Sequence, residues 1–178
     1  MAEAFSNKLA RAVGVVTSST GGSIGITTNK ITGISTTGVT VADLVETGNY
    51  LAGTKVSSIG AGQVVVDRDS TNTAASSSQN VKFLTPHTLY TSTGLKTILI
   101  GGTFANNTNG QVGLTVEVTD NSASITVAVA GKIPVPAGSS FVISDTGKTL
   151  LESGDSIKIY CDTANAIDAN ISILTGVN

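Results

Sequence analysis

The stretch from Ile133 to Tyr160, IPVPAGSSFVISDTGKTLLESGDSIKIY, restricts the fold more than any other part of the chain. Pro134 and Pro136 have no backbone N–H to donate, so the segment that holds them must lie at a sheet edge or in a crossover. Three turn-forming clusters then separate short apolar runs: Ala137–Ser140, Asp145–Gly147 and Ser153–Asp155. The pattern predicts short antiparallel strands, with Asp155 accepting hydrogen bonds from backbone N–H groups in its turn.

The composition indicates a core without large aromatic side chains and a surface with few charges. The chain has 178 residues, of which 40% are apolar but only 4% aromatic, and it has no Trp. Charged residues make up 12%, about half of the ~25% of an average domain. Such a surface suits a chain packed in an assembly, although extracellular β domains share it. The net charge of −2, without a basic run, argues against a nucleic-acid partner.

No targeting, membrane or disulfide signal stands out. No run reaches the ~18 apolar residues of a membrane span, so we expect no membrane partner. Glu3, Lys8 and Arg11 interrupt any apolar core of a secretion signal, which favours synthesis and initial folding in a cytoplasm. The single cysteine, Cys161, excludes an intrachain disulfide.

Residues 3–13 are predicted to form a short amphipathic helix, which ends at Gly14. Phe5, Leu9 and Val13 recur at i, i+4 and i+8, which would put them on one helix face. A helix this short is marginal in water, so its apolar face must contact something. Either it packs on its own domain, or residues 1–19 form an arm whose Phe5, Leu9 and Val13 bind a neighbouring subunit.

Residues 20–84 are predicted to form a small β module. Val39–Val45 alternates in polarity, and Thr54–Ile59 and Gln63–Asp67 flank Gly60-Ala61-Gly62, a hairpin signal. The polar run Asp67–Asn80 is expected to be a long loop that leads into a strand over Asn80–Leu84.

Residues 95–178 are predicted to form a second, larger domain, reached through a connecting segment over residues 85–94 that contains Pro86. Its expected strands are Leu95–Phe104, Gln111–Thr119, Ala123–Ala130, Phe141–Ile143, Leu150–Leu151, Ile157–Tyr160 and Ala169–Leu174. Seven or so strands separated by turns are typical of an antiparallel β-sandwich, here of a jelly-roll-like kind. The predicted fold is therefore all-β, with two β modules and a short N-terminal helix or arm.

The residues that enzymes require are sparse. His87 is the only histidine, which excludes a multi-histidine metal site, and it lies in the polar connecting segment. Cys161 ends an apolar strand and is expected to be a buried structural thiol. The run Asp67–Asn72 resembles the start of a calcium loop but lacks the glycine and the bidentate glutamate of that motif, so a solvated loop is favoured. We expect no enzyme activity, no cofactor and no metal site.

The C-terminal part, Leu95–Asn178, resembles small virion structural proteins of tailed phages that infect marine and freshwater bacteria, notably cyanophages. The matching segments are Lys96–Ile100, Ile133–Ser140, Leu151–Ile157 and Ile171–Leu174. Phe5–Arg11 is similar to the start of shorter relatives, so residues 20–84 would be an inserted or added module. Within it, Gly53–Ile59 resembles small domains of phage fibre and structural proteins. These are strand and turn residues, which specify a fold better than a role.

Three functions follow as expectations. The first is a capsid decoration protein, located in the virion and contacting the major capsid protein or neighbouring virion proteins, with self-association; the resemblance implies that a trimer is possible. The second is a neck, tail or fibre-adaptor component. The third is a carbohydrate-binding or adhesion module, for which the aromatic supply is small: Phe5, Phe83, Phe104, Phe141, Tyr50, Tyr90 and Tyr160.

Overall fold

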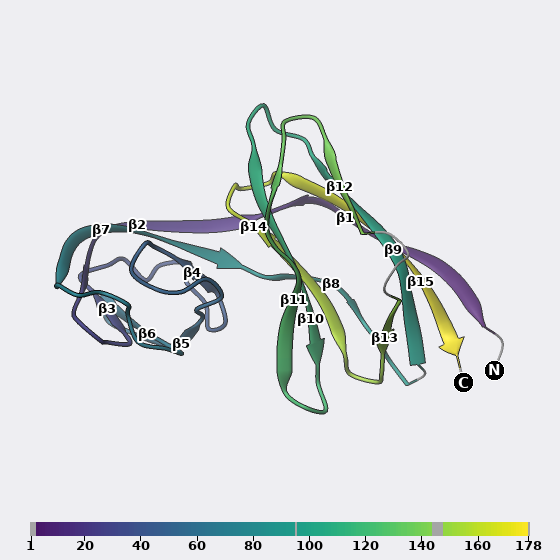
Figure 1. Ribbon diagram of the computed structural model, residues 1–178, viewed down its shortest axis with the longest axis horizontal. Coiled ribbons are helices and arrows are strands. Elements are labelled where there is room, and N and C mark those ends of the chain that lie inside the picture. The colour runs from purple at the N-terminus through teal and green to yellow at the C-terminus, as the bar shows by residue number, and fades with distance from the viewer. Residues whose placement is uncertain (1–2, 95, 144–147, 178) are drawn as a thin grey trace. The chain divides into compact units, whose positions relative to one another are not determined.

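The computed structural model describes residues 3–94, 96–143 and 148–177, and every regular element within these ranges is a β-strand (Figure 1). The chain divides into two units: Met1–Gly14 together with His87–Asn178, and Val15–Pro86. The first unit, called the sandwich here, is thus interrupted in sequence by the second, called the inserted unit. The predicted all-β fold is confirmed.

The sandwich has two antiparallel sheets. Sheet 1 has the order β1-β15-β9-β12, and β13 also pairs with β9. Its strands are β1 (Ala4–Val13), β9 (Lys96–Asn106), β12 (Ser140–Ile143), β13 (Thr149–Leu151) and β15 (Ile167–Val177). Sheet 2 has the order β11-β10-β14-β8. Its strands are β8 (His87–Thr91), β10 (Val112–Asp120), β11 (Ile125–Val135) and β14 (Ser156–Cys161).

Alternating side chains of the two sheets form the sandwich core. Its largest fully buried members are Phe104, Leu114, Leu151, Ile157, Ile159, Ile167, Ile171 and Ile173. The ring of Phe141 stacks on that of Phe104, with the centroids 6.3 Å apart. Each buried aliphatic side chain contributes about 1.5–3 kcal/mol relative to exposure, so a core of branched aliphatics compensates for the scarcity of aromatics.

The inserted unit is a six-stranded sheet of order β4-β7-β2-β3-β6-β5. Its strands are β2 (Val15–Ile24), β3 (Lys30–Thr32), β4 (Leu44–Glu46), β5 (Val56–Gly60), β6 (Gln63–Val66) and β7 (Ser76–Thr85). A separate core includes the fully buried Ile24, Ile31, Val64, Val81 and Phe83. The hairpin predicted around Gly60-Ala61-Gly62 is confirmed as β5–β6, and Gly62 adopts a left-handed φ of 66° in its turn.

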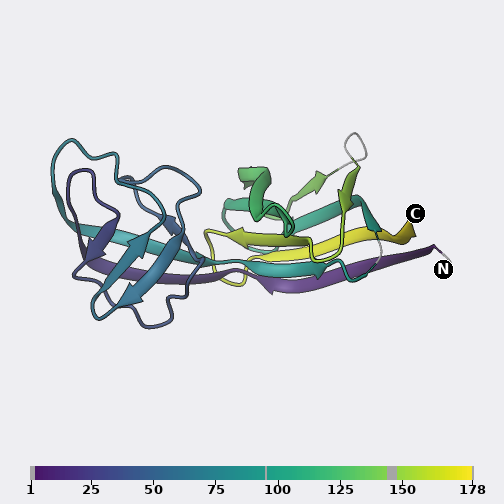
Figure 2. The ribbon, with the colours of Figure 1, turned by 90° about the horizontal axis from the view of Figure 1, so that it is seen from below.

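The N-terminal helix predicted over residues 3–13 is wrong, because this segment is strand β1. It pairs antiparallel with β15, from Ala4 opposite Thr175 to Val13 opposite Ile167, and Figure 2 shows the two strands side by side. A spacing of four residues brings side chains to one face in a helix and also in a strand, whose period is two. The spacing between Phe5 and Leu9 is therefore compatible with both a helix and a strand. The segment forms a strand because it pairs with β15.

Residues 85–94 were predicted to be a connecting segment, but part of this segment forms a strand. His87–Thr91 forms β8, an edge strand of sheet 2 that pairs with β14. Only Pro86 separates β7 from β8, because proline cannot continue the hydrogen-bond ladder and one residue suffices to change sheets. Two boundaries in the inserted unit differ too: β4 covers only the end of the predicted strand Val39–Val45, and β7 begins inside the predicted loop Asp67–Asn80.

The expectation for the proline-containing segment is confirmed. Pro134 lies in β11, which is an edge strand of sheet 2, and its partner in β10 is Gly113. Asp155 accepts hydrogen bonds from the backbone N–H groups of Asn121, at 2.9 Å, and Glu152, at 2.8 Å, as expected of a turn acceptor. The predicted turn Asp145–Gly147 lies outside the described residues.

Candidate functional site

An apolar row crosses the outer face of sheet 1. Phe5 of β1 lies opposite Leu174 of β15, Leu174 lies opposite Ile98 of β9, and Ile98 lies opposite Leu150 of β13. Directly opposed residues point to the same side of a sheet, so all four side chains share one face. Neighbouring strands are about 4.8 Å apart, and the row therefore extends roughly 14 Å. We call these four residues the apolar row.

The row faces away from the core. The residues that flank it in sequence, Ile173, Leu99 and Leu151, are buried in the sandwich core, so the alternation of the strands directs the row outward. Phe5 is 64% exposed and Leu150 is 48% exposed, whereas Leu174 and Ile98 are half-buried between them. Exposed apolar side chains that gather on one face, instead of being scattered, are typical of an interaction surface.

A second line of opposed residues runs parallel to the apolar row. Leu9 lies opposite Asn170, Asn170 opposite Thr103, and Thr103 opposite Val142. An open hollow of about 570 Å³ lies here, lined by Leu9, Ala10, Arg11, Thr103, Ala105, Asp168, Ala169 and Asn170. Between the two lines, the Ser172 hydroxyl donates a 3.0 Å hydrogen bond to Asn7 Oδ1. The part of the face between Phe5 and Leu9 thus carries neutral polar groups beside the apolar ones.

The structure brings together two of the three residues predicted to bind a partner and separates the third. Phe5 and Leu9 share the outer face, and Leu9 is 75% exposed. Val13 is 5% exposed and belongs to the core. A bulge between Ala10 and Val13, where Ala12 has φ 54°, changes the side to which the end of β1 points. The prediction that Val13 lies on the binding face with Phe5 and Leu9 is therefore wrong.

The other members of the apolar row were missed by sequence reasoning. Ile98, Leu174 and Leu150 lie in segments predicted as strands, and the alternation in each strand could have marked them as outward. Their alignment with Phe5 depends on the register of four strands, which no local pattern of the sequence specifies.

The inward side of β1 carries a charge at the border of the sandwich. The ammonium group of Lys8 lies 5.7 Å from the centre of the Tyr90 ring, a cation–π contact. The Tyr90 hydroxyl is within hydrogen-bonding distance of Thr97 Oγ1, at 3.1 Å. An inward-pointing lysine is one of the means by which edge strands avoid pairing with other chains.

Cys161 is buried, as expected. Its thiol donates hydrogen bonds to the carbonyl oxygens of Val13, at 3.4 Å, and Thr163, at 3.1 Å. Burial is the main factor that raises the pKa of the Cys161 thiol above its ordinary value. A protonated, inaccessible thiol is a poor nucleophile. His87, the only histidine, lies exposed on β8.

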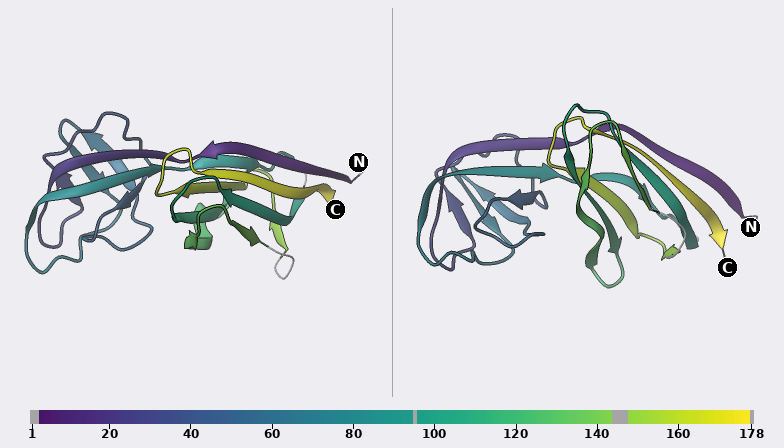
Figure 3. Two further views of the ribbon diagram at one scale, coloured as in Figure 1. Left: turned by 90° about the horizontal axis from the view of Figure 1, so that it is seen from above. Right: turned by 45° about the horizontal axis from the view of Figure 1, so that its top comes forward.

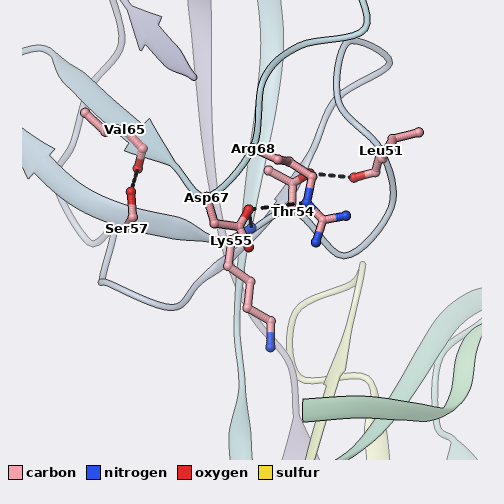
Figure 4. A network of polar contacts seen from close by, with 7 residues as sticks. All are labelled: Leu51, Thr54, Lys55, Ser57, Val65, Asp67 and Arg68. Carbon is pink, nitrogen blue, oxygen red and sulfur yellow. Dashed lines mark hydrogen bonds and ion pairs between the residues drawn. The ribbon is translucent and has the colours of Figure 1, made fainter. Parts of the chain in front are cut away.

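The run Asp67–Asn72 uses its oxygen atoms to brace the inserted unit. Asp67 Oδ1 accepts a 3.0 Å hydrogen bond from the backbone N–H of Lys55 and lies 3.5 Å from Arg68 Nε (Figure 4). The Ser70 hydroxyl donates to the Gly25 carbonyl, at 2.8 Å, and accepts from the Thr28 N–H, at 3.2 Å. No group of three or more His, Cys, Asp or Glu side chains that could hold a metal occurs among the described residues.

The pKa of Tyr50, a residue of the inserted unit, is far above its ordinary value. Burial, followed by the charge of Asp69, raises the pKa of Tyr50 to about 12. Its hydroxyl donates toward the carbonyl oxygens of Thr28, at 3.1 Å, and Lys30, at 3.3 Å. The tyrosine thereby ties a loop to β3, which is a structural role.

Comparisons with known proteins assign neither a family nor a function to the chain. No protein-family model matches the sequence, and no curated protein is significantly similar to it. One solved structure that is similar to the chain is a chain of infectious bursal disease virus, Gx strain, with 14% identity and a TM-score of 0.34. The match covers 96% of this chain and 55% of that one, so the present chain spans just over half of its length. A likeness of this degree identifies neither a family nor a function.

Within the described residues, no helix is long and apolar enough to cross a membrane.

Proposed function

We propose that the chain is a non-enzymatic structural protein of a virus particle, and specifically a decoration protein that binds and stabilises the outer shell of a tailed-phage capsid. The observation that carries the proposal is the apolar row on the exposed outer face of sheet 1. The resemblance of Leu95–Asn178 to phage virion proteins supplies the context, and the major capsid protein is the proposed partner.

The geometry of the row suits binding to a fixed protein surface. Its side chains project from paired strands, so little backbone freedom is lost when a partner covers them. Burial of apolar area contributes about 25 cal/mol per Å². The exposed Lys96, two residues before Ile98 on β9, borders the row and would have to stay in water at the rim of the interface or pair with an acidic group of the partner. Leu9 and the adjacent hollow offer a place for a side chain of the partner. In this proposal the face of a folded sheet takes the place of the helical arm, which was one of the two alternatives that the sequence left open.

The alternative of a carbohydrate-binding module has weak support. Sugar-binding sites commonly use exposed aromatic rings as stacking platforms. Phe83, Phe104, Tyr50 and Tyr160 are buried, and Phe141 and Tyr90 are half-buried, which leaves Phe5 as the single exposed aromatic side chain. One ring among aliphatic neighbours favours a protein partner over a glycan.

A neck, tail or fibre-adaptor role stays open as a second candidate, because Gly53–Ile59, which leads into β5 of the inserted unit, resembles fibre domains. Copy number separates it from decoration. Quantitative mass spectrometry of purified virions should give a copy number of this chain close to that of the major capsid protein, as expected of a shell component. A small fraction of that ratio would replace decoration by the neck or tail role, and absence from the particle would exclude both.

The binding face can be tested with capsids that lack the protein. Phe5→Asp should weaken attachment of the added protein by at least tenfold, because a charge would be buried against an apolar surface. Leu51→Asp is the matched control, since Leu51 is 59% exposed and lies in the inserted unit. Equal attachment of both variants would show that another surface binds the capsid.

A further inference from the structure

The edge of sheet 2 that β11 forms differs from the other strand edges of the sandwich. All five residues from Ile125 to Val129 are exposed, and Ile125, Val127 and Val129 are 56%, 56% and 45% exposed. β11 pairs with β10 on one side, and no described strand pairs with its other side (Figure 3). The outer N–H and C=O groups of this run are therefore available to another strand.

Natural edge strands are generally protected, and most edges described here are. β1 carries Lys8 and Arg11, β8 follows directly after Pro86, and β4, β12 and β13 have three or four residues each. The run Ile125-Thr126-Val127-Ala128-Val129 has no charge, no proline and no glycine, and most of its residues favour strands. The residues of β11 that would hinder pairing with another strand, Gly131, Lys132 and Pro134, all follow the run. An unprotected run of this kind aggregates unless a specific partner covers it.

The run is complementary to itself. In an antiparallel pair with two-fold symmetry centred on Val127, Val127 faces its own copy and Ile125 faces Val129, so apolar residues meet on one side. Thr126 then faces Ala128 on the other side. No like charges are opposed, because no residue between Asn121 and Gly131 is charged. The bulge in β11, between the positions opposite Val116 and Glu117, ends the regular ladder near Val129 and limits the pairing to this run.

We propose that the occupant of this edge is a second copy of the chain, with two β11 strands paired antiparallel about Val127 to join two sheets 2 into one continuous sheet. A pairing of only five residues on each strand gives a weak dimer, so a large share of dimer is expected only at high protein concentration. The proposal concerns the chain itself and does not depend on the virion role, so its failure and the failure of that role are separable.

Self-association of the full chain provides the first test. Sedimentation equilibrium of the wild-type protein over a wide concentration range should show a monomer–dimer equilibrium. Val127→Lys should weaken dimerisation at least tenfold, because the two-fold axis would place two like charges opposite each other. Val41→Lys is the matched control, since Val41 is 60% exposed in the inserted unit, and it should dimerise as the wild type does. A monomeric wild type, or a Val127→Lys variant that dimerises normally, would overturn the proposal.

Cysteine cross-linking tests the register and does not require a charged variant to fold. Opposed residues of antiparallel strands have Cα atoms 4.5–5.5 Å apart, within the range that a disulfide spans. Val127→Cys should therefore form a covalent dimer under mild oxidation. Ile125→Cys should not, because its two copies would lie roughly 13 Å apart along the strands. The native Cys161 is buried and should not compete. Equal cross-linking of both variants, or of neither, would overturn the pairing about Val127.

Discussion

Strands β1 and β11 are both edge strands of the sandwich with exposed apolar residues, but they expose different chemical groups. β1 presents Phe5 and Leu9 on a sheet face, and its inward Lys8 shields its open edge. β11 presents Val127 and its neighbours on an edge without charges. A face binds through side chains and so accepts a partner of matching shape, whereas an edge binds through the backbone and requires another strand. The proposed capsid contact and the proposed dimer would therefore use different chemical groups of one fold.

The two strands also differ in how firmly their ends are held. At the end of β1, the Val13 carbonyl accepts hydrogen bonds from the Ala166 N–H, at 2.9 Å, and from the Cys161 thiol, at 3.4 Å. The Gly14 carbonyl accepts from the Asn165 N–H, at 3.0 Å, and the Ala12 N–H donates to Asp168 Oδ1, at 2.8 Å. We call this group of contacts the β1 anchor. The exposed run of β11 has no comparable set of contacts outside its ladder with β10 among the described residues.

The largest effect is expected at Gly14, in the β1 anchor. Gly14 has φ +132°, and an added Cβ would collide with the Thr163 carbonyl oxygen and lie 2.8 Å from Cys161 Sγ. Gly14→Ala should lower the free energy of unfolding by about 3 kcal/mol or more, measured by urea denaturation. Gly131→Ala in β11 is the control: its added Cβ would meet only Ala128, at 3.9 Å, so the change should be within about 0.5 kcal/mol. Equal losses of unfolding free energy in Gly14→Ala and Gly131→Ala would contradict the prediction that β1 is held more firmly than β11.

A smaller effect is expected from three matched truncations. Val13→Ala removes buried carbon atoms and should cost about 2 kcal/mol of unfolding free energy. Leu9→Ala and Val127→Ala remove exposed ones, and each should change stability by less than about 0.5 kcal/mol. Leu9→Ala should weaken capsid binding and Val127→Ala dimerisation, each without affecting the other. A stability loss at Leu9 as large as that at Val13 would restore the single apolar face that the sequence suggested.

The sequence was informative wherever the structure is decided locally. The turn at Gly60-Ala61-Gly62, the hydrogen-bond acceptor Asp155, and the edge position of Pro134 each follow from the backbone chemistry of one or a few residues. The burial of Cys161 followed from its place at the end of an apolar strand. These features do not depend on which strands meet in the fold.

The apolar row and the secondary structure of residues 3–13 depend on pairing between strands that lie far apart in the sequence. Local sequence patterns were insufficient to predict either of them. Phe5 and Leu9 fit a helix and a strand equally, and the β15 strand that decides between them lies at the other end of the chain. The exposure of Ile125–Val129 was likewise not foreseen, because an apolar alternating run normally indicates a buried face. Whether such a run is central or at an edge depends on the strand order of the whole sheet.

The smallest effect is expected from the ionisation of Cys161, beneath the β1 anchor. Because the pKa of its thiol is raised in the folded chain, the unfolded chain loses this proton first as the pH rises through the ordinary thiol pKa of about 8.5. The folded state then binds more protons, so stability should fall with rising pH above that value and should be independent of this group below it. Between pH 8 and about pH 9.5 tyrosine is still largely neutral in both states, and the fall can be assigned to the thiol.

Urea denaturation across this window should show a steeper loss for the wild type than for Cys161→Ala. Self-association through β11 should stay constant over the same window, since Ile125–Val129 has no titratable side chain. Identical slopes for the two proteins would show that the thiol does not hold β1, and a dimer that dissociates in step with the fall in stability would tie the β11 edge to the anchor. A constant dimer beside a weakening anchor would establish that the two strands act independently.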